Sequence, residues 1–394
     1  MREPIQRRAP SSGQARSLNR PGGRRTSLSR QILAALGLAG TLVCLPVGVA
    51  LADDIHTRTQ AAIMSPLASR ALLIDVAMAG ERLVAVGSRG HIVFSDDRGE
   101  TWQQAPVPTR QLLTAVYFVD ERNGWAVGHD SLILHSSDAG ATWTVQYRDP
   151  DLEEMGDDEE DMGLLEKPLM DVWFRDAQTG FAVGAYGLAL RTDDGGETWD
   201  DISFDIDNPD GFHYNAIARI GDEGLFLVGE MGTMYRSPDL GDTWETLEDL
   251  PYDGSLFGVT GTGEESVVIA WGLRGNMFRS EDFGDSWQEV RLMTPGNGPL
   301  EATLSGGALS PDGQLVVVGA GGAIAVSKDR GRNFQVTIRP DRVGLASARV
   351  LDDGNLILVG QRGVMRAPAA APAAGATDVA APGAASDAPA PEAQ

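Results

Sequence analysis

One octapeptide recurs along this chain and sets a period that few folds can accommodate. The motif Ser-x-Asp-x-Gly-x-Thr-Trp first occurs at Ser95–Trp102, and a degenerate sixth copy ends at Phe334. The aromatic residues that close the copies are Trp102, Trp143, Trp199, Trp244, Trp287 and Phe334, so the steps between them are 41, 56, 45, 43 and 47 residues. A period in the forties indicates a repeat architecture, and a four-stranded propeller blade is one of the few units of that size.

A second landmark recurs seven times. Upstream of each octapeptide, an apolar run and a turn lead to a short strand that ends in Val-Gly or Trp-Gly, followed by an alternating apolar strand. The dipeptides are Val86-Gly87, Val127-Gly128, Val183-Gly184, Val228-Gly229, Trp271-Gly272, Val318-Gly319 and Val359-Gly360. We therefore predict an all-β protein, a seven-bladed β-propeller of four-stranded antiparallel blades, over residues 71–366.

The seventh unit, at Asp352–Ala367, has neither an octapeptide nor a fourth strand. Ring closure removes the exposed edges of the first and last blades, so the missing strand should come from the N-terminus. We expect residues 53–70 to supply it. Within them, the prediction is that Ala61–Leu67 pairs with the strand at Val364–Arg366.

Three segments lie outside the repeats. Residues 1–52 have a basic start, an apolar stretch and the ending Ala50-Leu51-Ala52, which predicts a signal peptide cleaved after Ala52 and export to the periplasm. The pair Arg24-Arg25 leaves both the general secretory and the twin-arginine routes open. An acidic insertion, 149–162, explains the 56-residue step, and the Ala/Pro-rich tail, 367–394, is expected to be disordered.

Charge and cysteine content narrow the function. Without residues 1–52 the chain has 24 Lys and Arg against 55 Asp and Glu, a formal charge of −31. Such a surface repels nucleic acid and anionic lipid headgroups, so neither is an expected partner, and it favours a monomer. The one cysteine, Cys44, lies in the signal segment, which excludes disulfides and Cys-ligated zinc from the mature chain.

The octapeptide has the composition of a tight hairpin turn between the third and fourth strands of a blade. Its glycine can take positive φ, its Ser or Thr and its Asp can accept amides that the turn leaves unpaired, and its Trp can fill the wedge between blades. The predicted structural residues are Asp97, Gly99, Trp102, Asp138, Gly140, Trp143, Asp194, Gly196, Trp199, Asp239, Gly241, Trp244, Asp282, Gly284, Trp287, Asp329, Gly331 and Phe334. We expect Asp-to-Ala changes here to cost stability and leave function to the opposite face.

These residues resemble the Asp-box, or bacterial neuraminidase repeat, of sialidases. With seven Val-Gly hairpins in an exported chain, residues 56–366 more specifically resemble the photosystem II stability/assembly factor family. That resemblance implies a seven-bladed propeller that chaperones the assembly of membrane-protein complexes. The acidic insertion, the Ala/Pro tail and the large negative charge depart from the family's pattern, in which a basic patch binds the partner.

The turns between the second and third strands, called b–c turns below, lie opposite the Asp-boxes in a four-stranded blade. They carry the candidate binding residues Arg89, His129, Tyr186, Arg274 and Arg362. The alternative is that these are solvated hairpin tips. The acidic insertion belongs to the same face, where it could cover the channel mouth, contact the arginines, bind a basic partner or simply be solvated.

A catalytic role finds little support in the residues. Tyr186 and Glu230 fall on the face where a sialidase has its Tyr/Glu pair, but the arginine segment such enzymes need is missing. The stretch Asp205–Gly211 (DIDNPDG) is rich in possible calcium ligands without the full EF-hand pattern. We predict no catalytic residues, no metal and no cofactor. The function predicted is a non-catalytic binding or assembly module for a membrane or envelope protein complex, with a glycoside hydrolase and a calcium-stabilised structural propeller as alternatives.

Overall fold

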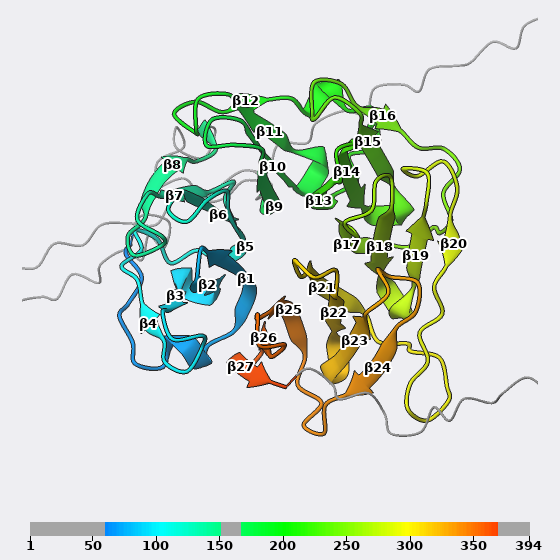
Figure 1. Ribbon diagram of the computed structural model, residues 1–394. Coiled ribbons are helices and arrows are strands. Elements are labelled where there is room, and N and C mark those ends of the chain that lie inside the picture. Colours follow the sequence, from blue (N-terminus) through cyan, green and yellow to red (C-terminus); the bar gives the residue numbers. More distant parts are fainter. Residues whose placement is uncertain (1–59, 151–166, 369–394) are drawn as a thin grey trace, which may run out of the picture. The chain divides into compact units, whose positions relative to one another are not determined.

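Seven small antiparallel sheets stand around a central axis, each with its first strand innermost (Figure 1). The computed structural model describes residues 60–150 and 167–368. The strands, blade by blade, are β1 (Leu73–Ala79), β2 (Arg82–Gly87), β3 (Ile92–Ser95) and β4 (Gln103–Gln104); β5 (Leu113–Phe118), β6 (Gly124–Gly128), β7 (Ile133–Ser136) and β8 (Thr144–Tyr147); β9 (Leu169–Phe174), β10 (Gly180–Gly184), β11 (Ala189–Thr192) and β12 (Asp200–Asp201); β13 (Tyr214–Ile220), β14 (Gly224–Gly229), β15 (Met234–Ser237) and β16 (Glu245–Thr246); β17 (Leu256–Gly261), β18 (Val268–Gly272), β19 (Met277–Ser280) and β20 (Gln288–Glu289); β21 (Leu304–Leu309), β22 (Leu315–Gly319), β23 (Ala323–Ser327) and β24 (Gln335–Ile338); and β25 (Leu345–Val350), β26 (Leu356–Gly360) and β27 (Gly363–Ala367). The predicted all-β, seven-bladed propeller is confirmed.

Helical structure in the described residues consists mainly of three-residue 3-10 turns: η1 (Ala68–Arg70), η2 (Ser88–Gly90), η3 (Ala185–Gly187), η4 (Ser203–Asp205), η5 (Glu230–Gly232), η6 (Leu273–Gly275) and η7 (Ala320–Gly322). Five of them, η2, η3, η5, η6 and η7, are b–c turns. No helix within the described ranges has the length and apolar character needed to cross a membrane.

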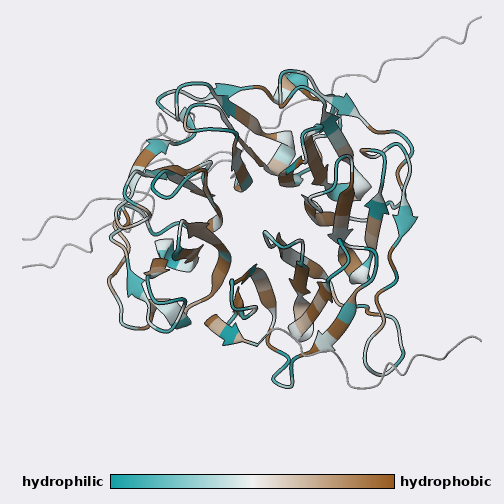
Figure 2. Ribbon diagram, viewed as in Figure 1, coloured by the Kyte–Doolittle hydropathy of each residue, from teal (hydrophilic) through white to brown (hydrophobic). Residues whose placement is uncertain are grey.

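Buried apolar side chains fill the wedges between neighbouring blades. Each of the seven clusters draws on two adjacent blades; for example, Val84 of β2 and Ala126 of β6 share one cluster, and Phe181 of β10 and Leu225 of β14 share another. Figure 2 shows the hydrophobic residues concentrated on the inner strands and the hydrophilic ones on the outermost strands and the connecting loops. Each blade is therefore stabilised by its neighbours, as in other repeat folds.

The Asp-box forms the same hydrogen-bond network in every copy. In the second blade, Ser136 Oγ donates to Asp138 Oδ1 at 2.8 Å and accepts the Gly140 amide at 2.8 Å. Asp138 also accepts the Thr142 amide at 2.9 Å and the Thr142 hydroxyl at 2.6 Å. The carboxylate thus closes the turn, and its hydrogen bonds hold the pKa of Asp138 below the usual value although partial burial opposes them.

The Asp-box glycine is also where each blade touches the one before it. Gly140 has φ +79°, and a β carbon there would lie 3.0 Å from Val84 of the preceding blade. Gly241, with φ +102°, would place a β carbon 2.0 Å from the Phe181 ring of blade three. The adjoining aromatic residue packs into the same interface, as Trp143 does at 5% exposure. Glycine is needed here both for the backbone conformation and for the close approach.

The connections alternate between two faces. On one face the Asp-box turns bond to the turns between first and second strands, as in the Phe283 amide donating to the Ser266 carbonyl at 2.8 Å. On the other, the b–c turns meet the crossovers between blades, as in the Gly90 amide donating to the Gln111 carbonyl at 2.8 Å. We call these the Asp-box face and the b–c rim.

The predicted closure by an N-terminal strand is wrong. Among the described residues, β27 pairs only with β26, so the seventh sheet has three strands. The segment Ala61–Leu67 instead follows the outer side of the first blade, where the Ala62 amide donates to the Val107 carbonyl at 2.9 Å. Pro66 has no amide proton to donate, and the chain turns at Ser65, whose carbonyl accepts the Ala68 amide at 3.2 Å just before η1.

The ring is closed by a crossover and not by a strand. Elsewhere the b–c glycine of one blade packs under the crossover that leaves that blade, as Gly90 does under Thr109 and Gly275 under Leu300. In the seventh blade Gly363 packs in the same way against Ser69. The N-terminal segment therefore supplies the crossover between the last and first blades.

Most of the acidic insertion, the predicted signal peptide and nearly all of the predicted tail fall outside the described residues. The insertion leaves the second blade at Asp149, which is 7% exposed and forms an ion pair with Lys167 at 3.8 Å. Ser131 Oγ, in the b–c turn of that blade, donates to the Lys167 carbonyl at 2.8 Å. Asp149 and Lys167, the described residues on either side of the gap, therefore meet on the b–c rim.

Candidate functional site

In four of the seven blades the b–c rim presents an exposed side chain from the same backbone conformation. In five blades the middle residue of the turn is left-handed, and in four of these it is a large residue: Arg89 (φ 60°), Tyr186 (φ 58°), Met231 (φ 52°) and Arg274 (φ 56°). The fifth is Gly321 (φ 62°). Glycine adopts this left-handed conformation with the lowest steric cost. The four larger residues therefore occupy positions where the backbone conformation favours glycine.

Two of the predicted binding residues flank the junction of the last and first blades. Arg89 and Arg362 are both exposed. Each is followed by the glycine that packs under a crossover: a β carbon on Gly90 would lie 3.2 Å from the Arg110 α carbon, and one on Gly363 would lie 2.6 Å from the Arg70 α carbon. Arg70 is exposed and Arg110 half-buried. Arg362 and Arg70 therefore lie together where the seventh blade meets the first, and Arg89 and Arg110 lie together at the crossover from the first blade to the second. The sequence predicted one residue of each pair.

Tyr186 belongs to a cluster that joins the third and fourth blades. Its ring meets His213 edge to face, with centroids 4.7 Å apart, and remains 45% exposed. His213 Nδ1 lies 3.6 Å from Glu230 Oε1, and the His213 amide donates to Glu230 Oε2 at 3.1 Å. Met231, 55% exposed, completes a surface with an apolar part and one carboxylate.

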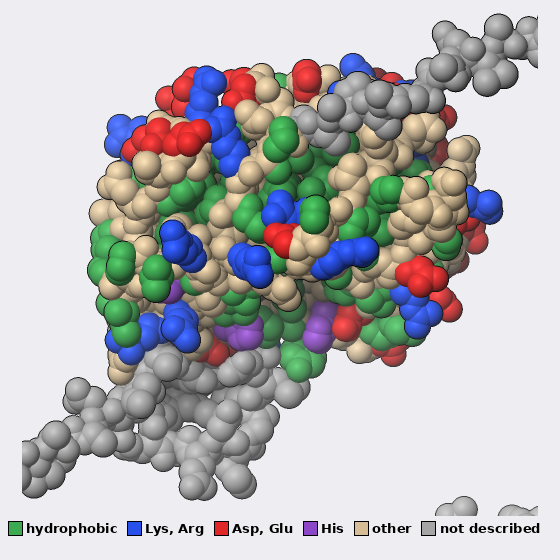
Figure 3. Space-filling model, turned by 90° about the horizontal axis from the view of Figure 1, so that it is seen from below, with side chains coloured by type: hydrophobic (Ala, Val, Ile, Leu, Met, Phe, Trp, Pro, Cys, Tyr) green, Lys and Arg blue, Asp and Glu red, His purple; other side chains and the backbone are tan. Residues whose placement is uncertain are grey.

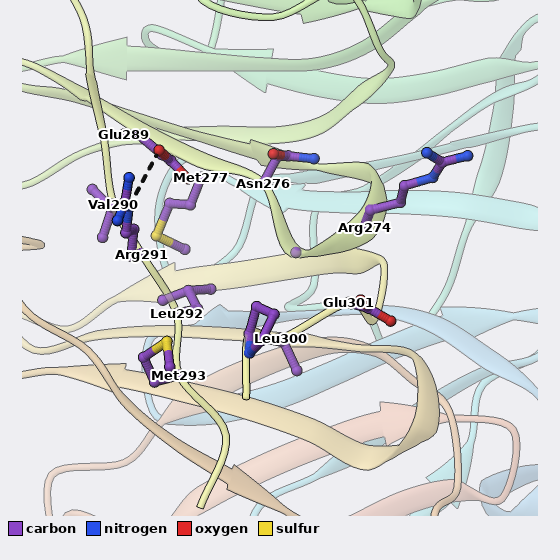
Figure 4. A pocket seen from close by; sticks show the side chains of 12 residues that line it. Arg274, Asn276, Met277, Glu289, Val290, Arg291, Leu292, Met293, Leu300 and Glu301 are labelled. Atoms are coloured by element: carbon purple, nitrogen blue, oxygen red, sulfur yellow. Dashed lines mark ion pairs between the residues drawn. The ribbon is translucent and has the colours of Figure 1, made fainter. Parts of the chain in front are cut away.

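Arg274 stands at the edge of a pocket of about 770 Å³ between β19, β20 and the crossover to the sixth blade (Figure 4). The buried side chains of Met277, Leu292 and Leu300 line it. Arg274 extends from the loop tip at one end, and the pair formed by Arg291 Nε and Glu289 Oε2, at 3.5 Å, lies at the other. The pocket offers an apolar floor between charged sides.

His129 differs from the other predicted residues because its turn has another shape. There, Asp130 (φ 58°) and Ser131 (φ 49°) are left-handed, both are buried, and the His129 amide donates to the Leu112 carbonyl at 3.0 Å. Gln111 Nε2 donates to Asp130 Oδ2. His129 itself is half-buried. The five predicted residues thus share one rim but occupy separate blades and do not form one compact site.

A central channel of about 760 Å³, lined by the inner strands, holds charged residues that the sequence reasoning missed. Asp75 of β1 accepts the Val116 amide at 3.0 Å, and Asp171 of β9 accepts the Ile217 amide at 2.9 Å. Burial raises the pKa of Asp171 to about 7; the bond from Ile217 counteracts this and the charge of Asp75 adds to it. Each Asp follows Leu-x at the start of an inner strand, a repeated acid in an apolar run that could have identified them.

The residues considered for the alternative sites lie around the b–c turn of the third blade. In the described ranges no group of three or more His, Cys, Asp or Glu side chains could hold a metal ion. The stretch Asp205–Gly211 is organised by Asn208, which accepts the Phe212 amide at 3.0 Å and donates to the Phe212 carbonyl at 2.8 Å. Tyr186 and Glu230, the possible sialidase pair, both contact His213.

The fold and the rim together define the class of protein, which is an Asp-box β-propeller with large exposed side chains on its b–c rim. The family model described as "Photosynthesis system II assembly factor YCF48" matches residues 57–152 and 158–296. The chain belongs to this family, as the sequence analysis predicted.

Comparisons with individual proteins give the same family. The chain is 29% identical to the photosystem II assembly lipoprotein Ycf48 of Synechococcus sp. strain CC9902, over 85% of this chain and 97% of that protein. A solved structure described as YCF48 bound to D1 peptide superposes with a TM-score of 0.58 at 17% identity, covering 79% of this chain and 97% of that one. YCF48 from Cyanidioschyzon merolae gives 0.56 at 15% identity, covering 78% and 98%. These two structures share the fold.

Proposed function

We propose that this protein is a non-catalytic, exported assembly module that binds a segment of a membrane protein through its b–c rim. The observation that carries the proposal is the row of exposed large side chains at left-handed turn positions, Arg89, Tyr186, Met231 and Arg274, where glycine would suit the backbone better. The relatives' names, photosystem II assembly lipoprotein and YCF48 bound to D1 peptide, support a membrane-protein partner.

The rim's chemistry indicates what kind of segment it would bind. Arg89, Arg274 and Arg362 would pair with carboxylates, either acidic side chains or a chain terminus. The pocket beside Arg274 would take an apolar side chain, since its floor is formed by Met277, Leu292 and Leu300. An extended peptide that alternates acidic and apolar residues would satisfy both features.

The remaining expectations from the sequence belong to the same proposal. The signal segment would direct export to the periplasm, with cleavage after Ala52, and the propeller would act as a monomer. Docking would need no bound cofactor or metal.

A pull-down from detergent-solubilised membranes tests the proposal. The variant Arg89→Glu, Arg274→Glu, Arg362→Glu should lose the membrane-protein partner that wild type retains. The matched control reverses three exposed arginines on the Asp-box face, Arg98, Arg122 and Arg330, and should keep the partner. Equal retention by both triple variants, at unchanged melting temperature, would contradict a role for the b–c rim.

A further inference from the structure

We propose that the outer side of the first blade, beside its junction with the seventh, docks on a lipid bilayer that carries anionic headgroups. The surface consists of Ile63, Met64 and Leu67 together with Arg70 and Arg110, and we call it the seam patch. The proposal concerns the orientation of the propeller at a membrane and does not depend on which protein the b–c rim binds.

The seam patch exposes several large apolar side chains close together in the chain. Ile63 is 62% exposed, Met64 57% and Leu67 59%. With Leu72, at 39%, they are four of the nine exposed large apolar residues in the described part of the chain, and they lie within ten residues. Scattered apolar side chains on a surface need no explanation, but a contiguous group indicates an interaction site.

The patch is held in place by the first blade. The Ser65 amide donates to Gln104 Oε1 at 2.7 Å, and Gln104 Nε2 donates to the Ile63 carbonyl at 3.1 Å. Arg110 Nε donates to the Ala61 carbonyl at 3.0 Å. Because both neighbours of Met64 are fixed through β4, the apolar side chains are displayed in a defined arrangement and do not belong to a loose terminus.

The surrounding charge is positive, in contrast to the chain as a whole. The formal net charge is −24, yet residues 60–74, 101–119 and 342–351, which belong to the first blade and its two neighbours, contain no Asp or Glu. Glu100 and Asp353, which border these segments, both pair with Arg366. Arg70 and Arg110 lie in the first two of these segments, and the exposed Arg89 and Arg362 lie beside them through Gly90 and Gly363. Figure 3, which looks at this side of the ring, shows hydrophobic side chains next to a row of Lys and Arg.

An anionic bilayer surface matches this combination. Apolar side chains enter the boundary between headgroups and acyl chains, while arginines beside them contact lipid phosphates. The negative charge elsewhere on the chain would repel the same surface, so only this side can approach it. The expectation of no binding to anionic membranes followed from net charge alone, which ignores how the charge is distributed.

The position of the patch in the chain also favours a membrane as its binding surface. Ile63 lies eleven residues after Ala52, the end of the apolar segment Ile32–Ala52. If that segment is in a bilayer before cleavage, residues 53–62 can span at most about 35 Å when fully extended. The seam patch then stays near the membrane surface.

Vesicle sedimentation tests the proposal, using a chain that starts at residue 53. Such a chain keeps the closed ring, because the crossover at Ser69 and all seven apolar clusters lie within the described residues. Vesicles of phosphatidylglycerol and phosphatidylcholine should sediment wild type. The variant Ile63→Ser, Met64→Ser, Leu67→Ser should partition at least about tenfold more weakly. Arg70→Glu, Arg110→Glu should also weaken binding, and phosphatidylcholine alone should bind less.

The matched control is Phe204→Ser, because Phe204, at 98%, is the most exposed large apolar residue in the ranges that the structure describes and lies between blades three and four. It should bind vesicles as wild type does. Absence of wild-type binding, or equal binding by the triple serine variant, would overturn the proposal. So would light scattering that shows a wild-type dimer and a monomeric triple variant, since the patch would then join two copies of this chain.

Discussion

Gly363 of β27 lies directly against the backbone of Ser69, so that a β carbon on Gly363 would stand 2.0 Å from the Ser69 carbonyl oxygen. These residues belong to opposite ends of the propeller. Their contact repeats the packing of Gly90 under Thr109 and of Gly275 under Leu300. The last blade is thus fastened to the N-terminal segment by the geometry that fastens the first, fourth and fifth blades to their crossovers, where Gly90, Gly232 and Gly275 lie against backbone carbonyls.

The first prediction follows from this contact. Gly363→Ala should lower the free energy of unfolding by about 2 kcal/mol or more, because the methyl group would displace the crossover in addition to straining a residue at φ +75°. The control is Gly263→Ala, at φ +78° with nothing within 4 Å of the new methyl group, which should cost only about 1 kcal/mol. Urea unfolding of both variants measures the difference, and equal losses would show that the ring does not depend on this contact.

The second prediction concerns the Asp-box carboxylates. Asp138→Ala removes the acceptor for the Thr142 amide, the Thr142 hydroxyl and the Ser136 hydroxyl, and should cost about 1–3 kcal/mol of stability. Partner retention at a temperature where the variant is folded should not change. The neighbouring Ser137→Ala, an exposed position, serves as control. Lost binding at an unchanged melting temperature would mean that the Asp-box face takes part in docking.

The third prediction is a loss of stability in acid. Hydrogen bonds from Thr198 lower the pKa of Asp194 to about 2, and hydrogen bonds lower the pKa of Asp138 and Asp239 as well. A depressed folded-state pKa gives stability that is complete above the unfolded value of 3.8 and is lost as pH falls toward 2. Urea midpoints should therefore decline between pH 4 and pH 2, and more gently in Asp194→Ala. A wild-type midpoint that is constant over this range would contradict the assignment.

The fourth prediction concerns Asp171 and has the opposite sign. Because burial raises its folded-state pKa to about 7, the folded protein holds a proton that the unfolded chain releases near pH 3.8. The group therefore favours folding less as pH rises from 4 to 7. Asp171→Asn should remove this part of the pH dependence, whereas Asp205→Asn, outside the channel, should leave it. Hydrogen–deuterium exchange at pH 5 and pH 8 would give the same comparison.

The fifth prediction separates stability from binding on the b–c rim. Tyr186→Gly should change the free energy of unfolding by less than about 1 kcal/mol, because the backbone at φ 58° suits glycine. It should nevertheless weaken partner binding, since the ring exposed beside His213 is lost. Arg98→Gly, at φ 59° on the Asp-box face, is the matched control and should bind normally. Normal binding by both variants would remove Tyr186 from the binding surface.

Much of the fold could be predicted from the sequence because each repeat is held together by the same interactions between residues close in the chain. The Asp-box glycine, its hydroxyl and its carboxylate interact within five residues, so their spacing alone predicts the turn, and the seven Val-Gly hairpins predict the number of blades. Closure was mispredicted because it joins residues nearly 300 positions apart. Whether Ala61–Leu67 makes a strand or a crossover depends on the space that the seventh and first blades leave between them, and local propensity contains no information on that.

The candidate site was likewise predicted in part from the sequence and in part only from the structure. The sequence by itself determined the blades, the two faces and which side chains stand at the b–c turns, because these follow from strand periodicity and connectivity. Only the tertiary structure decided that Arg70 lies beside Arg362 and Arg110 beside Arg89, that His213 links Tyr186 to Glu230, and that Asp75 and Asp171 share a channel. The reason is that closing the ring brings distant blades together, and burial, pKa and local charge depend on those neighbours and not on position in the chain.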